Sequence, residues 1–416
     1  MTDAQSSPER GLGWTFTTMW TAAVASNAAD GLGRTAIPLI ATTLTRDPLL
    51  ISGITAIAFV PWFVFGLPAG VLVDRMDRRI AMSVANGIRV GMALAIAASI
   101  MTDALSIWLL YACVLVWGLG ETVYDTASHA MVPSIVRKGD LERANGRMLA
   151  AQQVVDGFIA TPIAGVLFAA AIALPVWSTA AGYLVGAALI LLLPLSVGRA
   201  FVTEPASVPE RRSAAADMRE PVSYLWNHLF LRRMVMLTSA VGFIGAFAQA
   251  SVVLLFLQDF DVPPALYGFV TAGISVGALA GTLLASRLVA RFGRGPILLV
   301  GSLLDAVGLL GVGFSPNAGV AVIFYAVGAA GIGLWNVPWG ALRQDIIPGR
   351  LLGRSIGLIR AVTWGMLPVG ALLGGLIARA GLALPFVIGG SVCLVVTLVA
   401  SRFLLSASRH SGADAP

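Results

Sequence analysis

Twelve long apolar stretches, separated by short polar or charged segments, restrict the fold of this chain more than any other feature. Each stretch has about 20 residues or more, the length that a helix needs to cross the ~30 Å hydrocarbon core of a membrane. Because lipid offers no hydrogen-bond partner to an exposed backbone amide, each stretch is predicted to be a helix. The expected spans are residues 14–44, 49–73, 80–101, 105–131, 147–172, 176–198, 233–258, 264–286, 296–314, 318–341, 355–378 and 383–405.

The composition excludes a water-soluble protein. Charged residues make up 12% of the 416 residues and apolar residues 57%, whereas soluble domains carry about 25% charged residues. The two cysteines, Cys113 and Cys393, lie in apolar runs, and there are three histidines. Neither a disulfide framework nor a metal site is therefore expected, and no cofactor is expected because the chain has no nucleotide-binding loop.

The distribution of basic residues predicts the orientation. Most of the 27 Lys and Arg residues fall in segments on one side of the expected spans, whereas the opposite loops contain Arg46 and Arg379. The positive-inside rule assigns the basic side to the cytoplasm, so both termini are expected there. The formal net charge of +6 then reflects membrane topology, and no nucleic-acid partner is expected. We expect a multi-pass protein of the cell inner membrane, in contact with lipid.

Weak internal repetition predicts two matched halves. Leu67–Leu72, followed by a basic loop, is echoed by Leu279–Leu284, followed by another. Parallel repeats of this kind are typical of transporters with a central site between the halves. The predicted organisation is a six-helix bundle at 1–198, a cytoplasmic linker at 199–232 with an interfacial helix near 222–228, a second six-helix bundle at 233–405, and a cytoplasmic tail at 406–416.

One loop carries a family resemblance. The run Gly70-Val71-Leu72-Val73-Asp74-Arg75-Met76-Asp77-Arg78-Arg79, between the second and third spans, resembles the loop signature of the major facilitator superfamily. The resemblance implies an all-α fold of two pseudo-symmetric six-helix bundles and a transporter rather than an enzyme. We expect a monomer. The resemblance also implies a gating loop, in which Asp74 contacts residues 353–355. The alternative is that these loop charges only set the topology. The gating-loop candidates are Gly70, Asp74, Arg75, Arg78 and Arg79.

A narrower resemblance concerns the fourth and fifth spans. The stretch 115–146, with Pro133 and Leu141-Glu142-Arg143-Ala144-Asn145, is similar to the branch that contains macrolide-efflux and enterobactin-exporter proteins. The run 157–166 partly matches the antiporter signature of the superfamily, although Thr161 and Val166 replace two of its glycines. This resemblance implies export by antiport, with Gly157, Pro162 and Gly165 as helix-packing positions.

Ionisable residues inside the first span need an explanation. A charge at bilayer depth costs at least ~2.5–3.5 kcal/mol on insertion scales, so such residues are paired or face water. Trp20, Asn27, Asp30 and Arg34 share one helical stripe, which is expected to face the central cavity. Asp30 is a candidate for carrying a proton or attracting a cationic substrate. Alternatively, it forms a local pair with Arg34.

The fourth span carries a ridge of polar residues. Glu121, Asp125 and His129 are spaced i, i+4 and i+8, so they lie on one helical face. Burial and a neighbouring carboxylate both favour the protonated form of a carboxyl. We hypothesise that Glu121 carries a proton and that Asp125 and His129 relay it, with hydrogen-bonded helix packing as the alternative. Asp156 in the fifth span is expected to join this relay or to pair with Arg360 or Arg147.

Other polar and aromatic positions complete the expected site. Arg89 and Asp305 occupy matching positions in spans three and nine, where a scaffold role is favoured. The inner surface of the second half is expected to carry polar and aromatic residues but few charges. Such a surface suits bulky amphipathic substrates better than sugars or phosphates. Tryptophans at such positions are alternatively packing residues. These substrate-cavity candidates are Gln249, Trp335, Asn336 and Trp339.

These observations predict a secondary active transporter. The favoured function is proton-coupled export of hydrophobic or amphipathic small molecules, drug-like or macrolide-like, by alternating access. The alternative is a dedicated exporter of a secreted metabolite such as a siderophore. A polytopic lipid-modifying enzyme is a remote alternative, because Glu121-x-x-x-Asp125 resembles half of an acidic diphosphate-binding motif but has no second acidic cluster.

Overall fold

The computed structural model describes residues 12–195 and 214–410, and these are helices joined by short loops. The first part contains α1 (Trp14–Leu44), α2 (Pro48–Arg75), α3 (Arg78–Met101), α4 (Ile107–Ile135), η1 (Lys138–Asp140), α5 (Leu141–Ala151), the π-helix η2 (Gln152–Ala160), α6 (Thr161–Ala170) and α7 (Leu174–Leu191). The second part contains α9 (Ala214–Asn227), α10 (Leu229–Gln249), α11 (Val252–Leu254), the π-helix η3 (Leu255–Asp259), α12 (Pro264–Phe292), α13 (Arg294–Gly313), α14 (Ala318–Ile346), α15 (Gly349–Gly365), α16 (Leu367–Ala378), α17 (Leu384–Ser406) and η4 (Ala407–His410).

Eleven helical runs in these ranges are long and apolar enough to cross a membrane, so the prediction of twelve apolar spans is wrong by one. The missing span is α1, which has 31 residues but carries Asp30, Arg34 and many Thr, Ser and Asn residues that lower its hydropathy. The helices of the fifth and eleventh spans begin at Leu141 and Gly349, earlier than expected. The additional first turns of these two helices carry charged residues. These turns can lie outside the apolar layer of the membrane.

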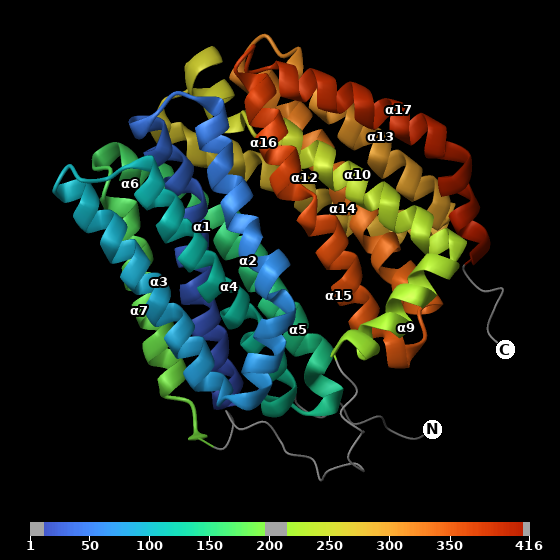
Figure 1. Cartoon of the computed structure of the whole chain (residues 1–416), viewed down its shortest axis with the longest axis horizontal. Coiled ribbons are helices and arrows are strands. Elements are labelled where there is room, and N and C mark those ends of the chain that lie inside the picture. The colour runs from blue at the N-terminus through green and yellow to red at the C-terminus, as the bar shows by residue number, and fades with distance from the viewer. Residues whose placement is uncertain (1–11, 196–213, 411–416) are drawn as a thin grey trace, which may run out of the picture.

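The helices form two bundles, which we call the first bundle (α1–α7) and the second bundle (α10–α17) (Figure 1). Helix α1 begins and α17 ends at the same end of the molecule, which we call the terminal end. We call the opposite end, where α1 ends and α2 begins, the distal end. The helices of the two bundles converge toward the distal end and diverge toward the terminal end (Figure 1). The prediction of an all-α polytopic fold is confirmed.

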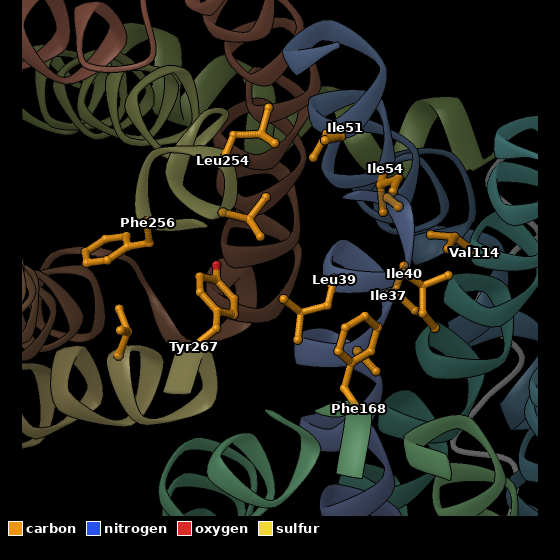
Figure 2. Close-up of a cluster of buried hydrophobic side chains, with 14 of the residues drawn as sticks. Ile37, Leu39, Ile40, Ile51, Ile54, Val114, Phe168, Leu254, Phe256 and Tyr267 are labelled. Carbon is orange, nitrogen blue, oxygen red and sulfur yellow. The ribbon is translucent and has the colours of Figure 1, made fainter. Parts of the chain in front are cut away.

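Among the residues that the structure describes, the buried apolar cluster shared by the two bundles lies near the distal end. There, Leu39 and Ile51 of the first bundle belong to the same buried cluster as Leu254 and Tyr267 of the second (Figure 2). Toward the terminal end the buried side chains divide into separate clusters. One contains residues of the first bundle, such as Met131, and another contains residues of α9 and the second bundle. The hydrophobic effect therefore holds the bundles together at the distal end.

The glycines between the bundles are also packed tightly at the distal end and loosely toward the terminal end. A Cβ on Gly268 of α12 would lie 1.9 Å from the carbonyl oxygen of Thr161 in α6, and one on Gly375 of α16 would lie 2.0 Å from Ser52 Oγ in α2. These backbones approach so closely that only glycine fits. By contrast, Gly70 and Gly353, toward the terminal end of α2 and α15, have no atom of a neighbouring helix within 4 Å of that position.

An ion pair joins the bundles at the distal end. Arg379, at the end of α16, donates from Nε to Oδ1 of Asp47 at 2.8 Å and from Nη2 to Oδ2. Asp47 Oδ1 also accepts from the backbone amide of Leu49 and so caps α2. The hydrogen bond from Arg379 holds the pKa of Asp47 below its ordinary value. We call this pair the distal latch.

The distal latch gives a pH-dependent prediction. Because the pKa of Asp47 is lowered in the folded protein, its contribution is present at neutral pH and is lost as the pH falls through that lowered value. We expect the distance between spin labels at Thr102→Cys and Pro316→Cys, measured by pulsed EPR, to increase only at strongly acidic pH. Asp47→Asn should remove this dependence, and an unchanged pH profile in that variant would assign the transition to another group.

Close backbone packing gives a second prediction. Gly268→Val should prevent α6 and α12 from meeting at the distal end, so the same label pair should show longer distances. Gly91→Val is the matched control, because a Cβ on Gly91 meets nothing within 4 Å. Equal distance distributions in Gly268→Val and the parent protein would show that the distal contact does not depend on this approach.

Candidate functional site

Asp30 in α1 lies in a buried polar network of the first bundle. Its Oδ1 accepts a hydrogen bond from Tyr183 Oη at 2.5 Å and lies 3.2 Å from Nη1 of Arg89, in α3. The Arg89 side chain is fully buried and its guanidinium packs over the rings of Tyr124 and Tyr183. The alternative of a local pair between Asp30 and Arg34 is therefore wrong, because each residue has partners on other helices.

Arg34, one turn further along α1, forms a second charge cluster. Its Nη1 lies 2.6 Å from Asp156 Oδ2 in η2, and its Nη2 lies 3.1 Å from Glu121 Oε1 in α4. The Arg34 side chain is 54% exposed, whereas the side chains of Glu121 and Asp156 are 21% and 11% exposed. Because a lipid-facing guanidinium is costly at this depth, this exposure indicates that Arg34 faces the space between the bundles.

The local backbone allows Asp156 to reach Arg34. Asp156 lies in a π-helical segment, a type of irregularity that is frequent at functional sites. Gly31 provides the room, because a Cβ there would lie 2.5 Å from the carbonyl oxygen of Asp156. Asp156 thus pairs with Arg34, and the expected pairs with Arg360 or Arg147 are not formed in this structure. The carbonyl oxygen of Arg147 instead accepts from Trp20 Nε1 at 3.2 Å.

The polar ridge of α4 extends from this cluster toward the terminal end. The helix is continuous through Glu121, Asp125 and His129, so the three lie on one face as the spacing predicts. Asp125 is partly buried and has no ion pair among the described side chains, and His129 is exposed. Their roles as proton carriers stay predictions.

The charges of the first bundle do not balance. The two clusters and the adjacent Asp125 contain two guanidinium groups and four carboxyl groups, and the guanidinium groups have acidic partners already. If every acid were ionised, the region would carry a net negative charge at membrane depth, where charge is costly. The members are Asp30, Arg34, Arg89, Glu121, Asp125 and Asp156, which we call the acid-rich network.

The proposed substrate-cavity residues are distributed unevenly. Asn27 is partly buried, Asn336 is exposed, and Gln249 is exposed and donates from Nε2 to Tyr325 Oη at 3.0 Å. Trp335 and Trp339 are 6% and 2% exposed and lie within the buried cluster of the second bundle. Packing is therefore their role in this structure, and substrate contact by any of these residues, or by Trp20, stays a prediction.

An aromatic contact between the bundles was missed by the sequence analysis. Trp62 of α2 meets Trp364 of α15 edge to face at a ring-centroid distance of 5.3 Å, and Phe59 lies 6.4 Å from the same ring. Arg360, one turn before Trp364, places its guanidinium 5.6 Å from that ring centroid. The only signal in the sequence was the position of Arg360 within a predicted span, which does not reveal a partner on α2.

The basic loop between α2 and α3 is tied to the first bundle. Arg78 Nη1 donates to the carbonyl oxygen of Ala130 in α4 at 2.8 Å, and Arg79 donates to the carbonyl oxygen of Leu193. Asp77 caps α3. Arg75 is exposed. The Asp74 side chain is outside the described residues, so its predicted contact with residues 353–355 stays a prediction.

The antiporter-like run lies at the boundary between the bundles. A Cβ on Gly165 would be 2.8 Å from the carbonyl oxygen of Ala265, and one on Gly157 would be 3.3 Å from Ser275 Oγ, both in α12. Pro162 occupies the first turn of α6, directly after the π-helix. The three residues thus place the fifth span against the second bundle, and a role in antiport stays a prediction.

Asp305 in α13 differs from the acids of the first bundle. It is 5% exposed, its Oδ2 lies 3.9 Å from Cys393 Sγ in α17, and it has no cationic partner in the part of the chain that the structure describes. The same part contains no group of three or more His, Cys, Asp or Glu side chains that could hold a metal ion.

The buried pair of Asp30 and Arg89 gives a stability prediction. Removing one member of such a pair leaves a buried charge uncompensated and costs about 3–5 kcal/mol. Arg89→Gln should therefore lower the thermal unfolding midpoint in detergent, and adding Asp30→Asn should restore part of it. Asp305→Asn is the control, because it leaves no cation behind. Equal losses in the single and double variants would show that the ion pair does not determine this stability.

The comparisons with known proteins agree with this architecture. Macrolide efflux protein A of Streptococcus pyogenes is 24% identical over 399 residues, which cover 92% of this chain and 94% of that protein. The multidrug efflux pump Tap of Mycolicibacterium fortuitum is 23% identical over 394 residues, which cover 90% and 93%. The crystal structure of a bacterial homologue of the iron transporter ferroportin, in an inward-facing state, has a TM-score of 0.73 at 15% identity and covers 93% of this chain and 98% of its own.

The family match covers nearly the whole sequence. The family described as transmembrane secretion effector matches residues 12–414, which include both bundles and the acid-rich network. The chain therefore belongs to the transmembrane secretion effector family of major facilitator superfamily transporters.

Proposed function

We propose that this transporter exports hydrophobic or amphipathic small molecules, macrolide-like or drug-like, in exchange for protons. The names of two relatives, a macrolide efflux protein and a multidrug efflux pump, support the substrate class. The bounds 1–198, 199–232, 233–405 and 406–416 remain our proposal for its bundles, linker and tail. Of the linker, residues 199–213 lie outside the described part, and α9 occupies the rest up to Asn227. We also propose that it acts as a monomer.

We place the terminal end in the cytoplasm of a cell with the protein in its inner membrane. Most of the basic residues outside the spans lie at this end, as the positive-inside rule requires of cytoplasmic segments. With this orientation, the conformation described above is open toward the cytoplasm and closed at the outer face by the shared core and the distal latch. A substrate from the cytoplasm or the inner leaflet would enter at the terminal end.

Alternating access follows as the proposed cycle. Closing the terminal end brings α2 and α4 toward α14 and α15, where Gly70 and Gly353 leave room for approach. Opening the outer face breaks the distal latch and exposes part of the shared apolar core. The antiporter-like residues Gly157, Pro162 and Gly165 lie in η2 and α6. This segment must slide along α12 or separate from it during this step.

The surplus of acids in the acid-rich network carries the proposal of proton coupling. Arg34 is shared by Glu121 and Asp156, and Asp125 has no ion pair among the described residues. Protons reduce the net negative charge of this region, and a cationic group of a substrate competes for the same carboxylates. We assign Glu121 as the proton carrier, with Asp125, Asp156 and His129 as the path toward the cytoplasm and Asp30 as a buried partner of Arg89.

A dedicated exporter of one secreted metabolite, such as a siderophore, is the second candidate. It shares the fold and the coupling and differs only in substrate range. A deletion strain separates the two: loss of resistance to several unrelated compounds favours drug export, whereas loss of one metabolite from the medium favours the dedicated exporter.

Transport in inside-out membrane vesicles tests the proposed function. A macrolide should accumulate in vesicles with an acidic interior, and Glu121→Gln should reduce this uptake to the level of vesicles that lack the protein, because an amide cannot carry the proton. Macrolide binding by the purified variant should remain measurable. Glu142→Gln is the matched control, because Glu142 is exposed on α5. Unchanged gradient-driven uptake in Glu121→Gln would contradict the assignment.

A further inference from the structure

A polar pocket lies at the terminal end of the molecule, apart from the acid-rich network. It is an open pocket of about 680 Å³ between α9 and the first turn of α15. Arg219, Ser223 and Asn227 of α9 lie on one wall, and Arg350 of α15 lies on another. The remaining lining residues are Glu220, Tyr224, His228 and Leu351.

The groups that line this pocket favour an anion. Guanidinium, hydroxyl and amide donors are those that bind phosphate oxygens in proteins. Glu220 forms an ion pair with Arg350, so the two arginines and this carboxylate leave one net positive charge, without counting His228. The pocket also adjoins the start of α15, which has no side-chain cap and no acidic residue in its first turn. The positive end of that helix dipole is therefore available to an anion.

An apolar stripe on α9 and its junction with α10 indicates where the membrane surface lies. Val222 and Trp226 lie one turn apart on α9, and Leu229 follows at the first position of α10; the three are 45%, 62% and 49% exposed. The guanidinium of Arg232 lies 5.4 Å from the centroid of the Trp226 ring. Exposed tryptophan beside arginine is typical of the membrane–water interface, and a helix with adjacent apolar and cationic faces lies in that interface.

The helix is held in this position by the second bundle. Leu225 is buried in the cluster of that bundle, and Tyr224 Oη donates to the carbonyl oxygen of Ile346, at the end of α14, at 2.8 Å. The apolar stripe and the pocket thus have a fixed relation to each other. With the stripe in the apolar edge of the bilayer, the pocket lies at the depth of the lipid phosphates.

We propose that this pocket binds the phosphate of an anionic phospholipid with a small headgroup, from the leaflet at the terminal end. The phosphodiester contacts Arg219, Arg350, Ser223 and Asn227, and the acyl chains lie along Val222, Trp226 and Leu229. A net-negative lipid is favoured over a zwitterionic one, because the pocket has a positive charge of its own. The site is independent of the proposed transport cycle.

Native mass spectrometry of the protein from nanodiscs tests this proposal. The nanodiscs contain phosphatidylcholine with a minority of phosphatidylglycerol. We expect the protein to retain phosphatidylglycerol in preference to phosphatidylcholine. The double variant Arg219→Gln/Arg350→Gln should lose about tenfold or more in retention, because two charge-assisted contacts are removed. Arg287→Gln/Arg291→Gln is the control, with the same charge change at exposed positions of α12.

Two further measurements keep the test decisive. Asn227→Leu preserves every charge but blocks part of the pocket, so it should also reduce retention while the unfolding temperature stays unchanged. Inorganic phosphate is added in a separate arm to distinguish a soluble anion from a lipid. Equal retention in the pocket and control variants, no preference for phosphatidylglycerol, or complete displacement by inorganic phosphate would each overturn the proposal.

Discussion

The cost of charge at membrane depth governs the structure of the first bundle. Six ionisable side chains lie within the spans of α1, α3, α4 and η2, and five of them, all but Asp125, form ion pairs between these helices. Asp30 and Arg89 form an ion pair in a buried position, with Tyr183 as a further donor to Asp30. Arg34 bridges Glu121 and Asp156 at the edge of the space between the bundles. The same interactions that stabilise the bundle thus hold Glu121 and Asp156 beside the partly exposed side chain of Arg34.

The packing between the bundles complements this electrostatic arrangement. The shared apolar core, the close backbone contacts at Gly268 and Gly375, and the pair of Asp47 and Arg379 all lie at the distal end. Toward the terminal end each bundle has its own core. Each bundle therefore has a core of its own toward the terminal end, and a change of conformation has to break the distal contacts and the aromatic contact of Trp62 with Trp364. The partial exposure of the Arg34 side chain agrees with the divergence of the bundles toward the terminal end (Figure 1).

The sequence predicted what depends on hydropathy and helical periodicity. The helix at residues 14–44 and the eleven more apolar spans follow from the runs between polar segments, and the ridge of Glu121, Asp125 and His129 follows from their spacing on a continuous helix. The α1 span has a lower hydropathy than the others because it carries several polar residues. These residues meet partners inside the bundle. The partners themselves could not be predicted, because the contact of Arg34 with Asp156 depends on the π-helical segment and on the absence of a side chain at Gly31. Asp47 and Arg379 are separated by 332 positions, and nothing in either segment identifies the other.

The most direct measurement is the number of protons exchanged when the purified protein binds a macrolide in weakly buffered detergent solution. If the acid-rich network holds surplus protons that a substrate displaces, binding will release protons, and the release will disappear when Glu121 is replaced by glutamine. Binding without any change in bound protons, or the same release in the variant, would contradict the account.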